Sequence, residues 1–62
     1  MNDDYVYRIT FRLKTPTGWE TRVDYTDCAS SEGDATSTIR MRNAGRQIDI
    51  VSVQRLSKND LP

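Results

Sequence analysis

The 62-residue sequence contains no histidine, one cysteine and no apolar run long enough to cross a bilayer. Without histidine, the chain lacks the commonest proton carrier of enzymes and a frequent zinc ligand. A single thiol, Cys28, cannot form an intrachain disulfide, which favours a reducing compartment. The N-terminus, Met1-Asn2-Asp3-Asp4, has neither the basic nor the apolar part of a signal peptide. We therefore expect a cytoplasmic protein that has no membrane partner.

The small size and the charge balance restrict the fold further. Hydrophobic residues make up 35 % of the chain, and nine basic side chains balance nine acidic ones. We expect residues 1–62 to form a single domain, with frayed ends at 1–4 and 57–62. Because so short a chain buries only about 60 % of its unfolded surface, the core must be thin. A partner or a second copy is then expected to cover apolar surface that one helix leaves exposed.

Two segments of alternating polarity predict a β-hairpin. Residues 5–14 carry aromatic or aliphatic side chains at odd positions and mostly polar ones at even positions. Residues 19–26 alternate again, with Trp19 and Tyr25 at odd positions. Pro16 and Gly18 between the two segments are typical of a turn that ends in a glycine bulge. We expect the odd positions of both strands to face the core and the even positions to face water.

The register of this hairpin has two solutions. The turn residues favour Thr15 opposite Trp19, and a shift by two residues sets Arg12 against Glu20 with a better pattern of opposite charges. Because the side chains alternate with a period of two, both registers keep the odd positions inward.

A helix and a third strand are predicted after the hairpin. Ser31 and the acidic residues after it, followed by arginines near residue 42, suit the dipole of a helix over 31–43. Residues 48–56 are rich in β-branched side chains, which favours a strand. The apolar positions in this strand change from even to odd. This change indicates either a bulge near Ile50 or partial burial of both faces.

The predicted order of elements is therefore β-β-α-β, an α+β fold. The third strand most simply pairs with the first, since a right-handed crossover through the helix brings it to that side. The expected architecture is a three-stranded antiparallel or mixed sheet of order 2-1-3. One helix packs on one face, and the other face stays open.

The sequence offers no arrangement of residues that suits catalysis, a metal or a cofactor. Cys28 follows Asp27 and has no base beside it in sequence, so it is expected to be a small filler rather than a nucleophile. The carboxylates between residues 24 and 34 lack the ligand spacing of a calcium loop. We expect a protein that is not an enzyme and that needs no cofactor.

The arginines point to a binding surface on the open face of the sheet. Seven of the nine basic residues are arginine, a residue enriched at protein interfaces. Trp19 is expected to be either the lid of the core or a partly exposed interface residue, and the lid is favoured. The candidate partner-binding residues are Arg8, Arg12, Arg22, Glu20, Asp24, Trp19 and Arg55.

Three kinds of partner are considered for this face. The first is another protein or protein complex. The second is a nucleic acid, which the arginines favour. The expected inward position of Trp19 and Tyr25 and the acids Glu20 and Asp24 count against it. The third is a second copy of the chain, in a homodimer joined either through strand edges or through this face.

Three passages give the chain a resemblance to a known group of proteins. They are Tyr7-Arg8-Ile9-Thr10-Phe11, Pro16-Thr17-Gly18-Trp19 and Ile50-Val51-Ser52-Val53-Gln54-Arg55-Leu56. In these passages the chain resembles the very short β-β-α-β accessory proteins of phages and prophages. That group includes inhibitors of host defences, anti-CRISPR proteins among them. The resemblance implies a protein that acts in the host cytoplasm by covering a surface of a larger host complex, without catalytic residues.

Overall fold

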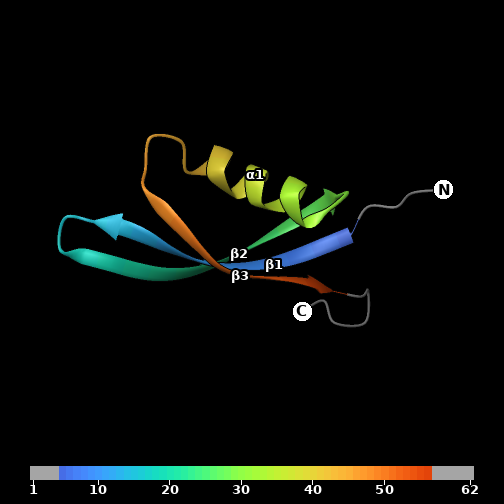
Figure 1. The fold of residues 1–62 in the computed structure, drawn as a ribbon, viewed down its shortest axis with the longest axis horizontal. Coiled ribbons are helices and arrows are strands. Elements are labelled where there is room, and N and C mark those ends of the chain that lie inside the picture. The colour runs from blue at the N-terminus through green and yellow to red at the C-terminus, as the bar shows by residue number, and fades with distance from the viewer. Residues whose placement is uncertain (1–4, 57–62) are drawn as a thin grey trace.

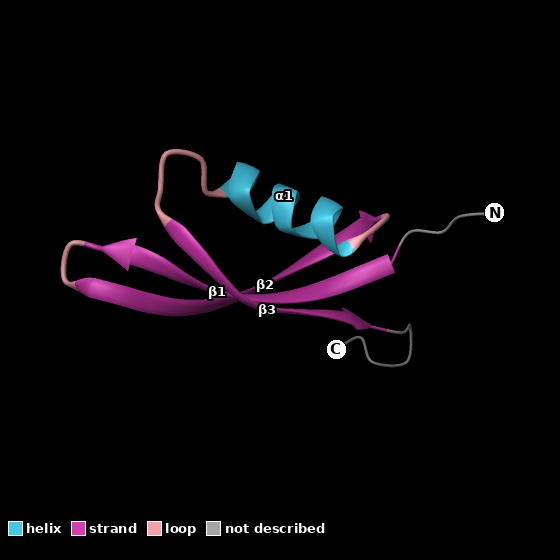
Figure 2. Ribbon diagram, viewed as in Figure 1, coloured by secondary structure: helices cyan, strands magenta, loops and turns pink. Residues whose placement is uncertain are grey.

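The computed structural model describes residues 5–56 and shows three strands and one helix in the predicted order (Figure 1). The expected fraying of 1–4 and 57–62 lies outside the described residues. Both strand pairings are antiparallel, in the order β2-β1-β3, and α1 lies over one face of the sheet (Figure 2). The predicted α+β architecture is therefore confirmed. The elements are β1 (Tyr5–Thr15), β2 (Gly18–Ala29), α1 (Glu32–Arg42) and β3 (Ile48–Leu56).

The core lies between α1 and the odd-numbered face of β1. Burial along β1 alternates as predicted, because every second side chain of the central strand points toward the helix. The helix contributes Ala35 and Ile39, which are one turn apart and fully buried. Partly buried side chains of β3 pack against this cluster. The buried cluster comprises Tyr7, Ile9, Phe11, Leu13, Ala29, Ala35 and Ile39.

The hairpin register differs from both predicted registers by one residue. The turn contains only Pro16 and Thr17, so Thr15 pairs with Gly18, which takes a φ of 140°. The Thr15 hydroxyl donates to the carbonyl of Gly18 at 3.1 Å. The glycine bulge expected from the sequence would have needed one more residue in the loop. Because a shift of one residue turns a strand over, the even positions of β2 share the helix side with the odd positions of β1.

The turned strand changes which β2 residues are buried. Thr26, opposite Tyr7, is the core-facing residue of this stretch and is 1 % exposed. Val23 and Tyr25 are 53 % and 38 % exposed. The prediction that the odd positions of β2 face the core is therefore wrong for residues 19–25.

Of the two alternatives predicted for residues 48–56, the structure shows the bulge. Phe11 pairs with Ile50, but Thr10 pairs with Ser52, so Val51 is the extra residue. The bulge reverses the side-chain alternation at the point where the sequence changes from even to odd apolar positions. Ile50 before it and Val53 after it can therefore both pack against the core.

The helix begins and ends within one residue of the predicted range. The Ser31 hydroxyl accepts a hydrogen bond from the Asp34 N–H at 3.1 Å, and the Asp34 carboxylate accepts from the Ser30 N–H at 3.0 Å. Asn43 caps the last turn, with its side chain donating to the Ile39 carbonyl. Gly45, at a φ of 82°, then takes the left-handed conformation that leads the chain back to the sheet.

We expect Thr26→Val to stabilise the protein by about 1 kcal/mol, because no group within residues 5–56 hydrogen-bonds the buried Thr26 hydroxyl. Thermal unfolding followed by circular dichroism should show a midpoint higher by about 4–8 °C. The control is Thr21→Val on the exposed side of β2, which should change the free energy of unfolding by less than about 0.5 kcal/mol. A Thr26→Val variant that unfolds at a lower temperature would contradict the expected absence of a partner.

Candidate binding surface

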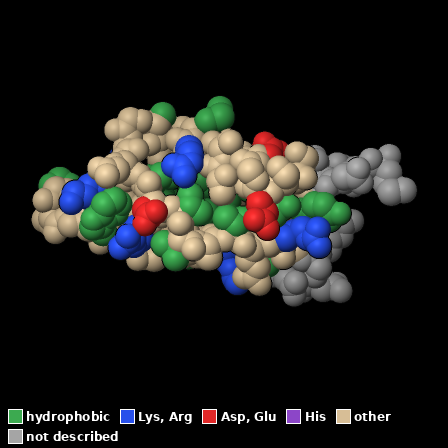
Figure 3. Space-filling model, viewed as in Figure 1, with side chains coloured by type: hydrophobic (Ala, Val, Ile, Leu, Met, Phe, Trp, Pro, Cys, Tyr) green, Lys and Arg blue, Asp and Glu red, His purple; other side chains and the backbone are tan. Residues whose placement is uncertain are grey.

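The side of the sheet opposite α1 is uncovered by any described element, and we call it the open face. The strand registers determine its members, because directly paired residues of neighbouring strands point to the same side. Figure 3 shows the molecule with α1 above the sheet, and on this side basic, acidic and hydrophobic side chains lie among one another. Leu56, at the end of β3, is the buried member of this face, at 6 % exposed. The open face comprises Val6, Arg8, Thr10, Arg12, Lys14, Trp19, Thr21, Val23, Tyr25, Asp49, Ser52, Gln54 and Leu56.

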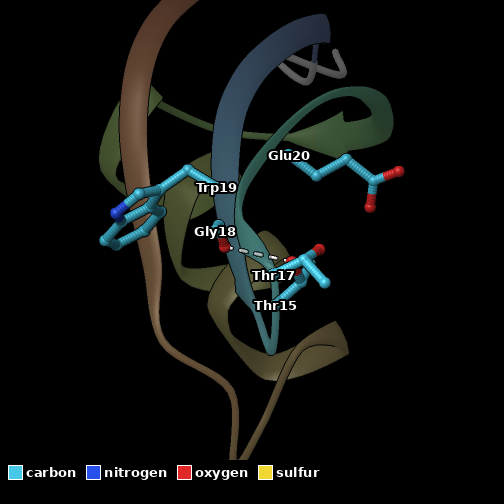
Figure 4. Close-up of a pocket in the computed structure, with 5 residues that line it drawn as sticks. All are labelled: Thr15, Thr17, Gly18, Trp19 and Glu20. Carbon is cyan, nitrogen blue, oxygen red and sulfur yellow. Dashed lines mark hydrogen bonds between the residues drawn. The ribbon is translucent and has the colours of Figure 1, made fainter.

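Trp19 lies on the open face and is 43 % exposed. Its side chain and that of Glu20 point to opposite sides of β2 (Figure 4). Two cations of β1 lie over the indole ring: the Arg12 guanidinium carbon is 5.2 Å from the ring centroid, and Lys14 Nζ is 5.3 Å from it. Trp19 is therefore an exposed residue held by cations, and the expectation that it forms the lid of the core is wrong.

Arg12 connects all three strands at this end of the face. Besides its contact with Trp19 on β2, it donates to the Asp49 carboxylate on β3 at 2.9 Å. Both partners of this ion pair are about half exposed, so the pair adds little stability. Its effect is to fix the guanidinium in position between the acid and the indole.

Arg8 has a different environment at the other end of the face. It lies opposite Tyr25 on β2 and opposite Gln54 on β3, and its guanidinium donates to the Gln54 amide oxygen. Among residues 5–56, no carboxylate forms an ion pair with Arg8. No described carboxylate therefore balances the positive charge of Arg8, whereas Asp49 balances that of Arg12.

The charges of the open face do not balance. Arg8, Arg12 and Lys14 face one carboxylate within the paired strands, that of Asp49. Asp27 is also exposed, but it lies in the bulge that β2 makes opposite the start of β1 and is not among the paired residues that define this face. The face is therefore moderately basic along β1, although the chain as a whole is neutral.

Four of the seven candidate residues lie on the helix side of the sheet, which corrects their expected position on the open face. The shift in register moves Glu20, Arg22 and Asp24 to that side, where Arg22 pairs with Glu20 at 2.8 Å and Asp24 with Arg42 at 3.1 Å. The β3 bulge moves Arg55, which lies opposite Tyr7 and 4.7 Å from the centroid of the Tyr5 ring. Arg8 and Arg12 lie on the open face as expected, and Trp19, which was expected on the core side, lies there too.

Sequence reasoning did not name Tyr25, Lys14 and Gln54 as candidate residues of this face. Lys14 was expected on the water-facing side with the other even positions of β1, and the register after the β3 bulge places Gln54 opposite Arg8 on the same side. Tyr25 was assigned to the core because β2 alternates regularly. That alternation alone does not show which side of the strand faces the helix.

Two hollows on the surface of residues 5–56 do not resemble active sites. One, of about 340 Å³, lies at the hairpin turn and is lined by Thr15, Thr17, Gly18, Trp19 and Glu20 (Figure 4). Another, of about 380 Å³, includes Arg22 and Arg46 and lies where the loop after α1 meets the hairpin. Neither places a nucleophile beside a base in the described part of the chain.

Metal and membrane sites receive no support from the described residues. Residues 5–56 contain no group of three or more acidic or cysteine side chains placed to hold a metal ion. The described helix is too short and too polar to cross a membrane. No protein-family model, curated protein or solved structure matches the chain.

We expect the double variant Arg12→Ala/Lys14→Ala to expose the indole of Trp19, because both cations lie over its ring. Trp19 is the only tryptophan, so quenching of its fluorescence by acrylamide measures this exposure directly. Quenching should increase, and each lost contact should lower the free energy of unfolding by about 0.5–1 kcal/mol. Arg8→Ala removes an arginine of the same strand that does not contact the ring, and it should leave the quenching unchanged. Equal quenching in all three proteins would contradict the stacking.

Proposed function

We propose that this protein is a non-enzymatic binding protein whose open face covers a surface of a partner protein. The observation that carries the proposal is that Trp19, Tyr25 and two arginines lie on the same sheet face, which no described element covers. Tryptophan, tyrosine and arginine are the residues that contribute most to protein interfaces. The mixture of apolar and charged groups is also typical of interfaces that form between separately folded proteins.

The partner surface in this proposal is acidic. Arg8 offers its guanidinium to a carboxylate of the partner, since no described carboxylate pairs with it. The Trp19 end offers a large apolar ring. Arg8 and Lys14 are six residues apart on β1, so the two ends are separated by about 20 Å. This span suits a protein surface better than a small ligand.

We further propose that the protein comes from a phage or a mobile element and acts in the host cytoplasm on a host defence complex. The support is the resemblance to small phage accessory proteins together with a fold that carries a binding face and no chemistry. Inhibition by covering a surface requires only affinity and position, and a domain of 62 residues can provide both.

Single-stranded nucleic acid is the second candidate, because one observation favours it. Trp19 and Tyr25 share the open face with Arg8, Arg12 and Lys14, as bases and phosphates would require. Glu20 and Asp24, which counted against this function, lie on the other side. The number of cations argues for the protein partner instead. Neutralising three phosphates gives a salt slope of only about −2, and Asp49 opposes even these contacts.

A homodimer formed through the open face is the least favoured candidate. Two copies placed face to face would bring two excesses of positive charge together. This repulsion argues against a homodimer that forms through the open face.

We expect Arg8→Glu/Arg12→Glu to weaken binding of the host partner by at least tenfold, which is about 1.4 kcal/mol. The partner is first isolated from host lysate treated with nuclease and identified, and its affinity is then measured with the purified components. The matched control is Arg22→Glu, the same change of charge on the same hairpin but on the helix side. Circular dichroism should confirm that both variants are folded. If the double variant binds as tightly as the original protein, the open face is not the binding surface.

We expect no saturable binding of a fluorescent thymidine oligonucleotide, even at low salt. If nucleic acid were the partner, Trp19 fluorescence would be quenched on stacking, and the affinity would fall with salt with a slope of about −2. Saturable quenching with that slope would make nucleic-acid binding the favoured function in place of protein binding.

A further inference from the structure

The free edge of β2 is closed at Tyr25 by two charged side chains. β2 pairs with β1 on one side only, so its other side exposes backbone groups. The Tyr25 N–H donates to Asp24 Oδ1 at 2.8 Å, and the Tyr25 carbonyl accepts from Arg42 Nη1 at 2.9 Å. In an antiparallel strand, the N–H and carbonyl of one residue point to the same side. Both edge groups of Tyr25 are therefore occupied by side chains.

The same two side chains also bind each other. Arg42 Nη1 donates to Asp24 Oδ2 at 3.1 Å, so one guanidinium holds both a carboxylate and a backbone carbonyl. This arrangement, which we call the edge clamp, joins the last turn of α1 to the edge of the sheet. The pair Arg22–Glu20 lies on the same strand and the same side with similar exposure, but its recorded bonds are between side chains only.

We propose that the edge clamp keeps β2 from pairing with a second copy of the chain. A strand of 12 residues that has one unpaired edge and carries β-branched and aromatic side chains is a ready template for another strand. Occupying the N–H and carbonyl of Tyr25 removes two of the hydrogen bonds that such a strand would make. Because Arg42 comes from the helix, its side chain also covers the edge sterically.

A second copy is the occupant that the charges of β2 favour. An antiparallel pairing of two β2 strands about Val23 places Arg22 of each copy opposite Asp24 of the other. No register shift interrupts β2 between Gly18 and Thr26, so all paired side chains would lie on matching sides. In this dimer Asp24 exchanges Arg42 of its own chain for Arg22 of the second copy. The clamp and the dimer therefore compete for one carboxylate.

This inference does not depend on the proposed function. The clamp acts at the edge of the sheet, whereas the proposed partner binds the open face. Charge reversal at Arg8 and Arg12 tests the face and leaves Asp24 and Arg42 intact, so the two proposals can fail separately.

The experiment measures the mass in solution of the full-length chain by sedimentation or light scattering from micromolar to millimolar concentration. We expect the unaltered protein to remain at its monomer mass of 7.1 kDa. Arg42→Met keeps an unbranched side chain but removes the clamp, and it should form a dimer of twice that mass. Glu20→Gln breaks the neighbouring ion pair without opening the edge, and it should remain monomeric.

A second substitution identifies the surface that pairs. The N–H of Val23, two residues from Tyr25 on a regular strand, also points to the free edge, where proline is tolerated. Arg42→Met/Val23→Pro should therefore return to the monomer mass. A folded Arg42→Met that stays monomeric overturns the proposal, and so does a dimer that Val23→Pro leaves intact or an unaltered protein that already pairs through β2.

Hydrogen exchange provides a readout that does not need the Arg42 variant to fold. In the unaltered protein, the Tyr25 amide should exchange more slowly than the amides of Thr21 and Val23, because these point to the same edge without a clamp. Equal exchange at the three positions would overturn the clamp itself.

Discussion

The two-residue turn at Pro16 and Thr17 is the constraint on which the rest of the structure depends. It pairs Thr15 with Gly18 and so fixes every later pairing of the hairpin up to the bulge near Tyr5. Since strands alternate with a period of two, a loop longer by one residue would turn β2 over completely. Trp19 would then lie on the helix side of the sheet, and Glu20 would lie on the open face. The length of this loop therefore decides which side of β2 faces the helix and which lies on the open face.

The helix side tolerates charged residues because the helix covers only part of the hairpin. An α-helix of 11 residues is about 16 Å long, whereas a strand of the same length extends about 37 Å. Figure 1 shows the hairpin turn extending well beyond α1. Near that turn Arg22 and Glu20 can pair in solvent, and only at the other end, under the helix, does β2 need the small side chains of Thr26 and Ala29. Because the helix is short, the even-numbered side of β2 can face it although this side carries both charged and buried residues.

The sequence predicts the elements of this fold better than it predicts the candidate surface. Alternation within β1 is unambiguous, and the change of phase in β3 correctly indicates the bulge at Val51. Alternation shows which residues of one strand share a side, but it does not relate the sides of two neighbouring strands. That relation came from the turn, where Gly18 suits both a two-residue loop and a longer bulged one. Arg8 and Arg12 on the central strand were therefore placed correctly, while Arg22, Glu20 and Asp24 on β2 were not.

The cations around Trp19 explain how the unbound protein tolerates an exposed indole. An uncovered tryptophan favours nonspecific association, and Arg12 and Lys14 cover part of its ring with groups that remain hydrated. Contacts of this kind are worth only about 0.5–1 kcal/mol each at exposed sites. A partner that packs against the indole can therefore displace them at small cost. Because Asp49 also holds Arg12, this cation is fixed over the ring, and in the proposed complex that would lower the entropy lost on binding. The same contacts thus cover the indole in the free protein and would prepare it for the proposed partner.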